Sequence, residues 1–391
     1  MVSGHLREKR GIYQIILTYK DFNGKKKEKS MSTGLPIKNN KRKAEEMLME
    51  ARRNFIVPEQ ATTETLLSTF LDEWLVSVKH NIELSTYGSY QGYIDKANVY
   101  FDKQNKTLSG LEPKDIQDFY TYLLNEKSLS ANTVIHYHAV LRKALQYAVR
   151  MDILTQNPMD RVERPKIPKF IGSFYNTQEV NSLLEAVRDK QIEFAVVVGV
   201  FYGLRRSEIV GLKWNAIDFA QNTISIQHTV IQTVVDGEYM LIQKDRAKNK
   251  SSIRTLPLVA EFRELLLNLQ KKQEEYKRLC GNCYNYDYEE YIFVDEMGNL
   301  IKPNFITQNF KIILRNNNLR DIRFHDLRHT CASILINKGL SLKEIQEWLG
   351  HSNFATTANI YAHLEKNSKD KVAKTMLNSG INFSNKPSKK A

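Results

Sequence analysis

The hydrophobic and polar positions of the chain follow three successive patterns, and the first occupies residues 1–57. Apolar and aromatic residues crowd positions 12–19, which favours a β-strand, and Asn23-Gly24 is a typical hairpin turn. The run 25–33 is basic and polar and returns as a second strand. Positions 40–55 place apolar residues on one face of a helix. The first pattern therefore predicts a small α+β module, a β-sheet backed by one helix.

From residue 63 to about residue 156 the apolar residues repeat at helical spacing. Four helices are predicted, the second after Ser85-Thr86, the third at Pro113 and the fourth after Ser130, since Ser, Thr and Pro favour the first turn of a helix. These helices make an all-α bundle over residues 63–156. Its tyrosines either stack on nucleic acid or lie half-buried in the core, which is the more frequent place for them. The basic, proline-containing run 157–169 then predicts an extended linker.

The third pattern covers residues 170–391 and contains both helical and strand spacings of apolar residues. Residues 194–202 are the most apolar helical stretch, which ends at Gly203. Between 223 and 258 apolar residues alternate, which predicts a small antiparallel sheet with a lysine-rich hairpin at its edge. Most of the rest is predicted to be helical, and the C-terminal end is predicted to be a mobile basic tail. We therefore expect a multidomain protein whose third domain is mainly α.

Composition and charge add a nucleic-acid partner to this picture. A chain of 391 residues suffices for two or three domains, each with its own core. Its 57 Lys and Arg against 44 Asp and Glu give a net charge of +13, as expected of a protein that binds nucleic acid, although such charges also simply keep a domain soluble. The cations expected to contact DNA are Lys25, Lys26, Lys27, Lys29, Lys41, Arg42, Lys43, Arg161, Arg164 and Lys166.

Other partners and chemistries find little support in the composition. The three cysteines show no evident pairing, which fits a reducing compartment. Cys280 and Cys283 form one CxxC pair without the second pair that is typical of a zinc site. The longest apolar run, Phe194–Leu204, is far shorter than the roughly 20 residues needed to span a bilayer. We therefore expect a soluble cytoplasmic protein with no bound metal and no membrane partner.

Candidate chemistry concentrates toward the C-terminal end. His325 and Arg328 stand three positions apart, so they project from one face of a helix. A second helix is expected to begin with a capping box and to end at a glycine directly before His351. Tyr361 lies in a short amphipathic segment beyond it. The apolar faces of these short elements would pack two histidines, an arginine and a tyrosine together.

This set of side chains suits reaction at a phosphodiester. An arginine fork matches the non-bridging oxygens of a phosphate, and histidine donates to the same oxygens or moves a proton near neutral pH. A tyrosine hydroxyl, with a reference pKa of about 10, becomes a nucleophile where cations favour the phenolate. No cluster of carboxylates accompanies these residues. The set therefore indicates attack on phosphate without a metal or other cofactor.

The motifs themselves resemble those of a known family. GLRRSEIVGLKW occupies residues 203–214, and HDLRH, LGH and TTANIYAH follow in that order nearer the C-terminus. Their order is similar to that of the tyrosine recombinase (phage integrase) family, and the details are most like integrases of conjugative transposons and temperate phages. The resemblance implies the catalytic residues Arg205, Lys248, His325, Arg328, His351 and Tyr361, with Glu208 as a supporting acid.

Two of these assignments have neighbours that compete with them. In the family the arginine immediately after Gly-Leu is catalytic, which selects Arg205 over Arg206. The family carries its catalytic lysine in a hairpin before an I-P or L-P pair. Lys248 fits best, Lys250 is its close rival, and Lys244 fits less well.

The resemblance also implies a mechanism. Tyr361 would attack the phosphate to give a 3′-phosphotyrosyl link and a free 5′-hydroxyl. Arg205, Arg328 and His351 would bind the non-bridging oxygens, Lys248 would protonate the leaving oxygen, and His325 would accept a proton or bind phosphate. Resealing by another 5′-hydroxyl would need neither ATP nor metal. Such a site-specific recombinase integrates and excises a mobile element.

Partners follow from the same resemblance. The chain would bind double-stranded DNA at attachment or transposon-end sites through a core-binding domain, residues 63–156, and a catalytic domain, residues 170–391. Its N-terminal module would bind arm sites. Exchange between two duplexes implies a homotetramer on DNA in the bacterial cytoplasm, with a directionality factor as a further partner.

Three other functions remain alternatives. A type IB topoisomerase uses the same nucleophilic chemistry on a single duplex without needing a specific site. A DNA-binding regulator that has lost catalysis is disfavoured because every expected side chain is present. A metal-dependent phosphatase or nuclease is disfavoured because carboxylate ligands are missing near the histidines.

Overall fold

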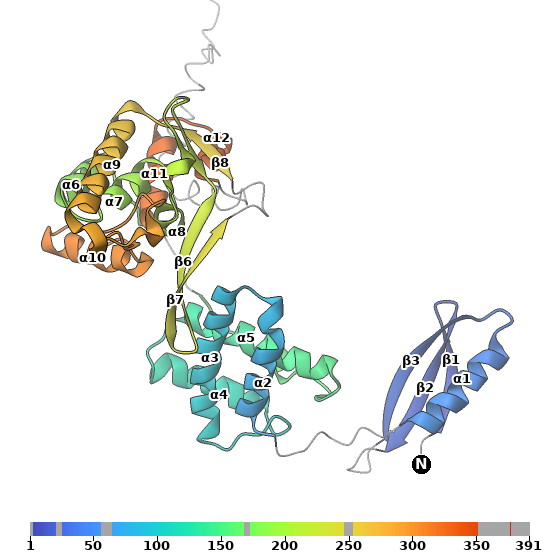
Figure 1. Cartoon of the computed structure of the whole chain (residues 1–391). Coiled ribbons are helices and arrows are strands. Elements are labelled where there is room, and N and C mark those ends of the chain that lie inside the picture. The colour runs from blue at the N-terminus through green and yellow to red at the C-terminus, as the bar shows by residue number, and fades with distance from the viewer. Residues whose placement is uncertain are drawn as a thin grey trace, which may run out of the picture. The chain divides into compact units, whose positions relative to one another are not determined.

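The computed structural model describes residues 3–20, 26–55, 65–167, 173–245 and 253–350 and, beyond these, Met376. The chain divides into two compact units, Met1–Ile167 and Pro168–Ala391 (Figure 1). The first unit contains a sheet with one helix, followed along the chain by helices. The second unit is mainly helical and carries short antiparallel strands.

Residues 3–55 form an antiparallel sheet with one helix packed on it. Its elements are β1 (Ser3–Lys9), β2 (Ile12–Lys20), β3 (Lys26–Pro36) and α1 (Lys41–Asn54). β2 is the central strand, and its Leu17 is fully buried. A Cβ atom on Gly4 of β1 would lie 2.8 Å from Leu17 and 3.0 Å from Leu48, so sheet and helix pack closely there. The predicted strands and helix are confirmed, whereas β1 escapes prediction because it is mostly polar; the turn at Asn23-Gly24 lies outside the described residues.

Residues 65–167 form a helical bundle. Its helices are α2 (Leu67–Val78), α3 (Leu84–Asp102), α4 (Pro113–Asn125) and α5 (Ala131–Arg150), with short 3-10 turns η1 (Lys79–Asn81) and η2 (Pro158–Arg161). Ser130 caps α5 as predicted, because its side chain accepts a hydrogen bond from the Thr133 N–H. The cap predicted at Ser85-Thr86 is wrong. The Glu83 carbonyl already accepts the Thr86 N–H at 2.8 Å, so α3 begins one residue before the predicted cap.

The tyrosines of the bundle lie mainly in its core. Tyr87, Tyr120 and Tyr137 are almost wholly buried. Within that core the Tyr120 hydroxyl lies 2.8 Å from Nδ1 of His138. For these three tyrosines the core alternative is confirmed, and stacking on nucleic acid is not open to them.

The helices of the second unit surround one apolar helix, α7. They are α6 (Thr177–Val187), α7 (Glu193–Phe201), α8 (Arg206–Val210), α9 (Ala260–Cys280), α10 (Pro303–Asn316), α11 (Asp326–Asn337) and α12 (Leu342–Leu349), with 3-10 turns η3 (Trp214–Ala216), η5 (Gly281–Cys283) and η6 (Tyr286–Tyr288). Helices α6, α8 and α11 contact α7 (Figure 1). Ala195, Val196 and Val198 of α7 have no exposed area. Among the described helices none is both long enough and apolar enough to cross a membrane.

The strands of the second unit form two sheets instead of the single sheet that the sequence predicts. Their bounds are β4 (Ile217–Asp218), β5 (Thr223–Ile226), β6 (His228–Val235), β7 (Glu238–Asp245) and β8 (Arg254–Pro257). One sheet has the order β4-β5-β8, and β6 pairs with β7 alone. Asp236 and Gly237 both have positive φ, 53° and 82°, which is the two-residue turn that suits a hairpin. The hairpin therefore extends from the helices as a separate ribbon (Figure 1).

Two glycines close the helices that meet near the candidate site. Gly350 ends α12 in the left-handed conformation, and Ser341 begins that helix with the predicted capping box to Glu344. Gly203 follows α7 with φ 62°, and a Cβ atom there would lie 2.3 Å from Leu349 Cδ2. Side chains other than hydrogen are excluded at Gly203 by both its conformation and its neighbours.

Replacing Gly203 by alanine should therefore lower stability more than the same change in an open turn. Gly237→Ala is the matched control, because Gly237 also has positive φ but no atom within 4 Å of the added Cβ. We expect Gly237→Ala to lower the free energy of unfolding by about 1–2 kcal/mol. Gly203→Ala adds overpacking and should cost about 2–5 kcal/mol in total. Urea denaturation measures the free energy of unfolding of both variants. Equal decreases would show that the Leu349 side chain moves aside at no energetic cost.

Candidate active site

The turn after α7 places an arginine beside a carboxylate. Arg205 occupies the N-cap position of α8, and Glu208 lies in its first turn. The Glu208 carboxylate accepts hydrogen bonds from the Arg205 backbone N–H at 2.9 Å and from Arg205 Nη1 at 2.7 Å. Arg206 instead donates to Thr307 Oγ1 at 2.5 Å. The fold thus separates two arginines that are adjacent in the sequence, and Arg205 is the one that meets Glu208.

A second arginine, which the sequence analysis did not single out, binds the same carboxylate. Arg254 of β8 lies 3.1 Å from Glu208 through Nη2 and 3.5 Å through Nη1. Its Nε also donates to the Trp348 carbonyl at 3.0 Å. Arg254 and Leu256 are both buried, whereas Thr255 between them is exposed. The alternation of the strand is therefore a signal that could have placed Arg254 on the inner face.

Arg328 is the most deeply buried cation of the site, with 1% of its surface exposed. It projects from α11 and donates to the Gly203 carbonyl through Nη1 and to the Leu349 carbonyl through Nη2, both at 2.6 Å. These carbonyls close α7 and α12, so one guanidinium joins two helix ends. Burial, with the charge of Arg205 nearby, lowers the pKa of Arg328 to about 9. Arg328 therefore still carries its charge at neutral pH.

His325 stands at the N-cap position of α11, one turn before Arg328. Its ring remains exposed, while protein atoms around it remove part of its hydration. This desolvation, together with the nearby His329 and Arg328, lowers the pKa of His325 to about 4. The two histidine rings meet edge to face, with centroids 5.3 Å apart. His325 is therefore a neutral imidazole at pH 7.

Charge balance at this cluster favours an anion. Burial by itself would raise the pKa of Glu208, but the charge and hydrogen bonds of Arg254, followed by those of Arg205, lower it to about 2. Arg205, Arg254 and Arg328 thus surround a single ionised carboxylate and leave a surplus of positive charge. Guanidinium forks present paired donors that match phosphate oxygens. The cluster is suited to bind a phosphate group.

Several predicted residues cannot be placed by the structure. Outside the described residues lie Lys25, Lys248, Lys250, His351 and Tyr361. His351 is bonded to Gly350, whose carbonyl accepts a hydrogen bond from Arg205 Nη2 at 3.3 Å. Arg205, Glu208, His325 and Arg328 are thus brought to one region, and the chain enters His351 from that same region.

The segment 246–252, which contains Lys248, follows a hydrogen-bonded strand end. Asp245, the last residue of β7, lies 2.5 Å from Nδ1 of His228. Nε2 of His228 lies 2.9 Å from the Tyr291 hydroxyl, which donates to Gln243 Oε1 at 2.9 Å. This chain of contacts fixes the base of the hairpin. Residues 291–294 make only isolated bridges, from Tyr291 to Lys213 and from Val294 to Leu300.

Most of the cations predicted to contact DNA lie on the surface. Exposed are Lys26, Lys41, Arg42, Lys43, Arg161, Arg164 and Lys166, whereas Lys27 and Lys29 are partly covered. In the bundle, Arg142, Lys143 and Arg150 of α5 line a pocket together with Arg164. The apolar spacing of α5 gives no indication of these cations, because it reports only the buried side of the helix.

Metal ligands and a second nucleophile find no support near the arginines. The described part of the chain contains no group of three His, Cys, Asp or Glu side chains that could hold a metal ion. Cys331 lies beside the site, but burial raises the pKa of its thiol to about 12. Its Sγ donates to the Phe201 carbonyl at 3.3 Å. Cys331 is therefore a protonated core residue.

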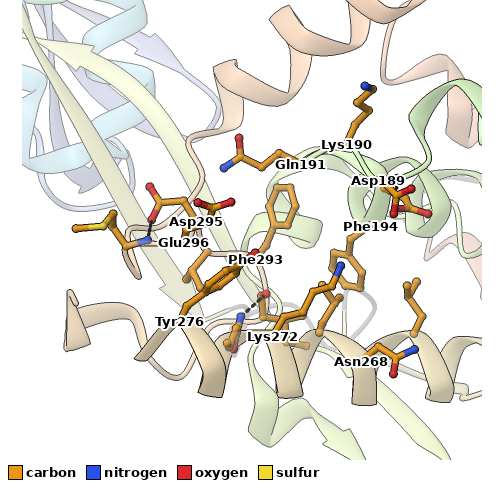
Figure 2. Close-up of a pocket in the computed structure, with 17 residues that line it drawn as sticks. Asp189, Lys190, Gln191, Phe194, Asn268, Lys272, Tyr276, Phe293, Asp295 and Glu296 are labelled. Carbon is orange, nitrogen blue, oxygen red and sulfur yellow. Dashed lines mark hydrogen bonds between the residues drawn. The ribbon is translucent and has the colours of Figure 1, made fainter. Parts of the chain in front are cut away.

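A pocket lined by residues of α7, α9 and the segment 292–297 (Figure 2) includes none of these arginines in its lining. Phe194, Phe293 and Lys272 line it, and Asp295 and Glu296 lie beside each other at one side (Figure 2). Acidic side chains outnumber basic ones along its lining. Such a pocket repels phosphate, so the arginine cluster is the better candidate for phosphodiester chemistry.

Comparison with known proteins gives consistent relationships. Residues 174–368 match the phage integrase family, and residues 66–165 match the phage integrase SAM-like domain. A tyrosine recombinase XerC-like protein of Caldanaerobacter subterraneus subsp. tengcongensis is 29% identical over 393 residues, which cover 96% of this chain and 98% of that protein. The ICEBs1 integrase of Bacillus subtilis (strain 168) is 26% identical over 347 residues, 86% of this chain and 90% of that protein.

Solved structures show the same fold. The Tn1549 transposon integrase in complex with transposon right end DNA superposes with a TM-score of 0.62 at 19% identity, over 80% of this chain and 99% of that one. The two family matches cover both the helical bundle and the unit that holds the arginines. The chain belongs to the phage integrase family of tyrosine recombinases.

Proposed function

We propose that this chain integrates and excises a mobile element by cutting and rejoining DNA at specific sites, with Tyr361 as the nucleophile. The observation that carries the proposal is the convergence of Arg205 and Arg328 beside the chain segment that enters His351. The ICEBs1 integrase and the Tn1549 transposon integrase among its relatives favour a mobile element as the parent.

In the proposed reaction the Tyr361 phenolate oxygen forms a bond to the scissile phosphorus, and the bond from phosphorus to the 5′-oxygen breaks. Arg205, Arg328 and His351 hold the non-bridging oxygens and stabilise the charge of the transition state. Preorganised donors of this kind are worth about 2–4 kcal/mol each. The phosphotyrosyl link keeps the energy of the phosphodiester, so a 5′-hydroxyl can reverse the step without ATP or a metal ion.

His325 takes the proton of Tyr361 in this proposal, or donates to the phosphate. Its lowered pKa supports the first role, because a neutral imidazole is available as a base at pH 7. A phosphate bound beside it would favour the protonated form and so raise its pKa. The imidazolium would then be stabilised at the moment when the phenol has lost its proton.

Lys248 gives its proton to the leaving 5′-oxygen. The described residues on either side of its segment support this assignment, since Asp245 is held by His228 and Arg254 by Glu208. One residue spans at most about 3.6 Å, so Lys248, three positions after Asp245, has its Cα within about 11 Å of it. Lys250 has a similar reach and remains the rival.

The proposed division of labour follows the parts of the chain. Residues 1–57 bind arm sites, residues 63–156 bind the core site, residues 157–169 link them along the DNA backbone, and residues 170–391 carry catalysis and a C-terminal tail. The exposed cations of the first part and of the linker support this assignment. Exchange between two duplexes requires four strand cleavages, so we propose a homotetramer on DNA, with a directionality factor biasing its outcome.

The nucleophile can be tested with a nicked duplex that carries the attachment site and traps the cleaved product. In EDTA the wild-type chain should form a covalent DNA adduct, and Tyr361→Phe should form none, because the attacking oxygen is missing. Tyr239→Phe is the matched control, since Tyr239 is 72% exposed on β7, and it should react like the wild type. Equal adduct from Tyr361→Phe would reject the assigned nucleophile, and loss of the wild-type adduct in EDTA would favour the metal-dependent alternative.

The protonation of His325 can be followed by NMR of histidine-labelled protein, with His325→Gln assigning the resonance. We expect the free protein to titrate at this ring near pH 4, and the urea-unfolded chain near 6.5. Because the folded pKa is the lower one, the folded state binds fewer protons, so stability contributed by this ring falls as pH drops from 6.5 toward 4. A folded midpoint near 6.5 would contradict the neutral base.

The general acid can be identified with a duplex whose leaving 5′-oxygen is replaced by sulfur. Lys248→Ala should slow cleavage of the oxygen duplex by about 10²–10⁴-fold. It should cleave the sulfur duplex nearly as fast as the wild type, because a thiolate leaves without protonation. Lys250→Ala is the control and should cleave both duplexes normally. The reverse pattern would assign the role to Lys250. If the sulfur duplex restored the cleavage rate of neither variant, neither lysine would be the general acid.

A further inference from the structure

We infer that Arg254 is a positioning residue for DNA cleavage, which holds Glu208 and the end of α12 so that Arg205 meets the phosphate correctly. The inference rests on the proposed function and adds a residue to it. Arg254 belongs to β8, directly after the segment that contains Lys248. Its side chain contacts Glu208 and the end of α12.

The contacts of Arg254 join elements that are distant in the sequence. Its guanidinium lies against both oxygens of Glu208, at 3.1 and 3.5 Å, and its Nε donates to the Trp348 carbonyl at 3.0 Å. A Cβ atom on Gly350 would lie 2.8 Å from Arg254 Nη1, so the guanidinium also packs on the backbone that leads to His351. Strand β8, helix α8 and the end of α12 are therefore held at one point.

Exposure and side-chain contacts distinguish Arg254 from Arg205. The side chain of Arg254 is 7% exposed, whereas that of Arg205 is 30% exposed. Nη1 and Nη2 of Arg254 lie against Glu208 and its Nε donates to the Trp348 carbonyl, so we assign Arg254 to holding these neighbours and Arg205 to the phosphate. Arg205 keeps enough open surface to meet a phosphate while its own orientation is set by Glu208.

Charge gives a reason for a second arginine on this carboxylate. A buried Glu208 paired with Arg205 alone would neutralise the cation that has to bind phosphate. Arg254 supplies the compensating charge, so Glu208 stays ionised and orients Arg205 while the cluster keeps its positive surplus. A misplacement of about 1 Å at a reacting group costs about 10²-fold in rate.

The test uses the full-length chain with Arg254→Ala and Arg254→Lys. We measure affinity for an attachment-site duplex, thermal unfolding, and the single-turnover rate of covalent adduct formation. Cleavage should slow about 10²-fold in Arg254→Ala and at least about tenfold in Arg254→Lys, which keeps the charge but loses the fork. DNA affinity should change less than about threefold, since the guanidinium nitrogens of Arg254 are already held by Glu208 and the Trp348 carbonyl. Added guanidinium ion should restore part of the Arg254→Ala rate.

Arg263→Ala is the matched structural control. Arg263 of α9 donates to Asn222 Oδ1 at 3.0 Å and to the Phe219 carbonyl, without contact to Glu208. Arg263→Ala should lower the unfolding temperature and leave the cleavage rate unchanged. Glu208→Gln should lower the cleavage rate much less in the Arg254→Ala background than in the wild type, because both changes disturb the orientation of Arg205.

Three results would overturn the inference about Arg254. Wild-type cleavage rates in folded Arg254→Lys, or in folded Arg254→Ala, would overturn the inference and leave the proposed function intact. An Arg254→Lys chain that does not fold would also overturn it, because the role would then be structural only. A wild-type chain that forms no adduct with the attachment-site duplex would remove the proposed function, and this inference with it.

Discussion

The buried carboxylate of Glu208 is the contact on which the rest of the candidate site depends. It has no exposed surface, and it accepts hydrogen bonds from Arg205 and Arg254. An unpaired charge in that position would be strongly destabilising, so the two arginines have to come to it. Because the pKa of Glu208 falls to about 2, the stability it contributes is present above pH 4.5 and is lost only as pH falls toward 2.

Arg328 is also a buried charge that needs partners, but its charge is positive. It is buried between the carbonyl ends of α7 and α12, and these ends are favourable places for a cation. Left-handed glycines, Gly203 and Gly350, close both helices and let their backbones approach the arginines. The fold thus holds Arg254 and Arg328 in the interior and leaves Arg205, with 30% of its side chain exposed, as the most accessible of the three arginines.

Local signals in the sequence identified much of the architecture. The capping box of α12, the Ser130 cap of α5 and the apolar run of α7 each depend on residues within a few positions of one another, and these predictions are confirmed. Local signals failed at two places. Ser85-Thr86 offered good caps, yet α3 began before them, and the alternating strands 223–258 gave no indication that β6 and β7 would leave β5 and β8 as a separate sheet.

The sequence by itself determined the family motifs, and with them the choice of Arg205, Glu208, His325 and Arg328, because motif order is a property of the chain alone. The tertiary structure decided which residues contact one another and how their pKa values shift. Arg254 meets Glu208 across 46 positions and Trp348 across 94, and the lowered pKa values of His325 and Arg328 arise from burial among distant segments. No local pattern encodes such contacts, since desolvation and charge pairing depend on which surfaces pack together in space.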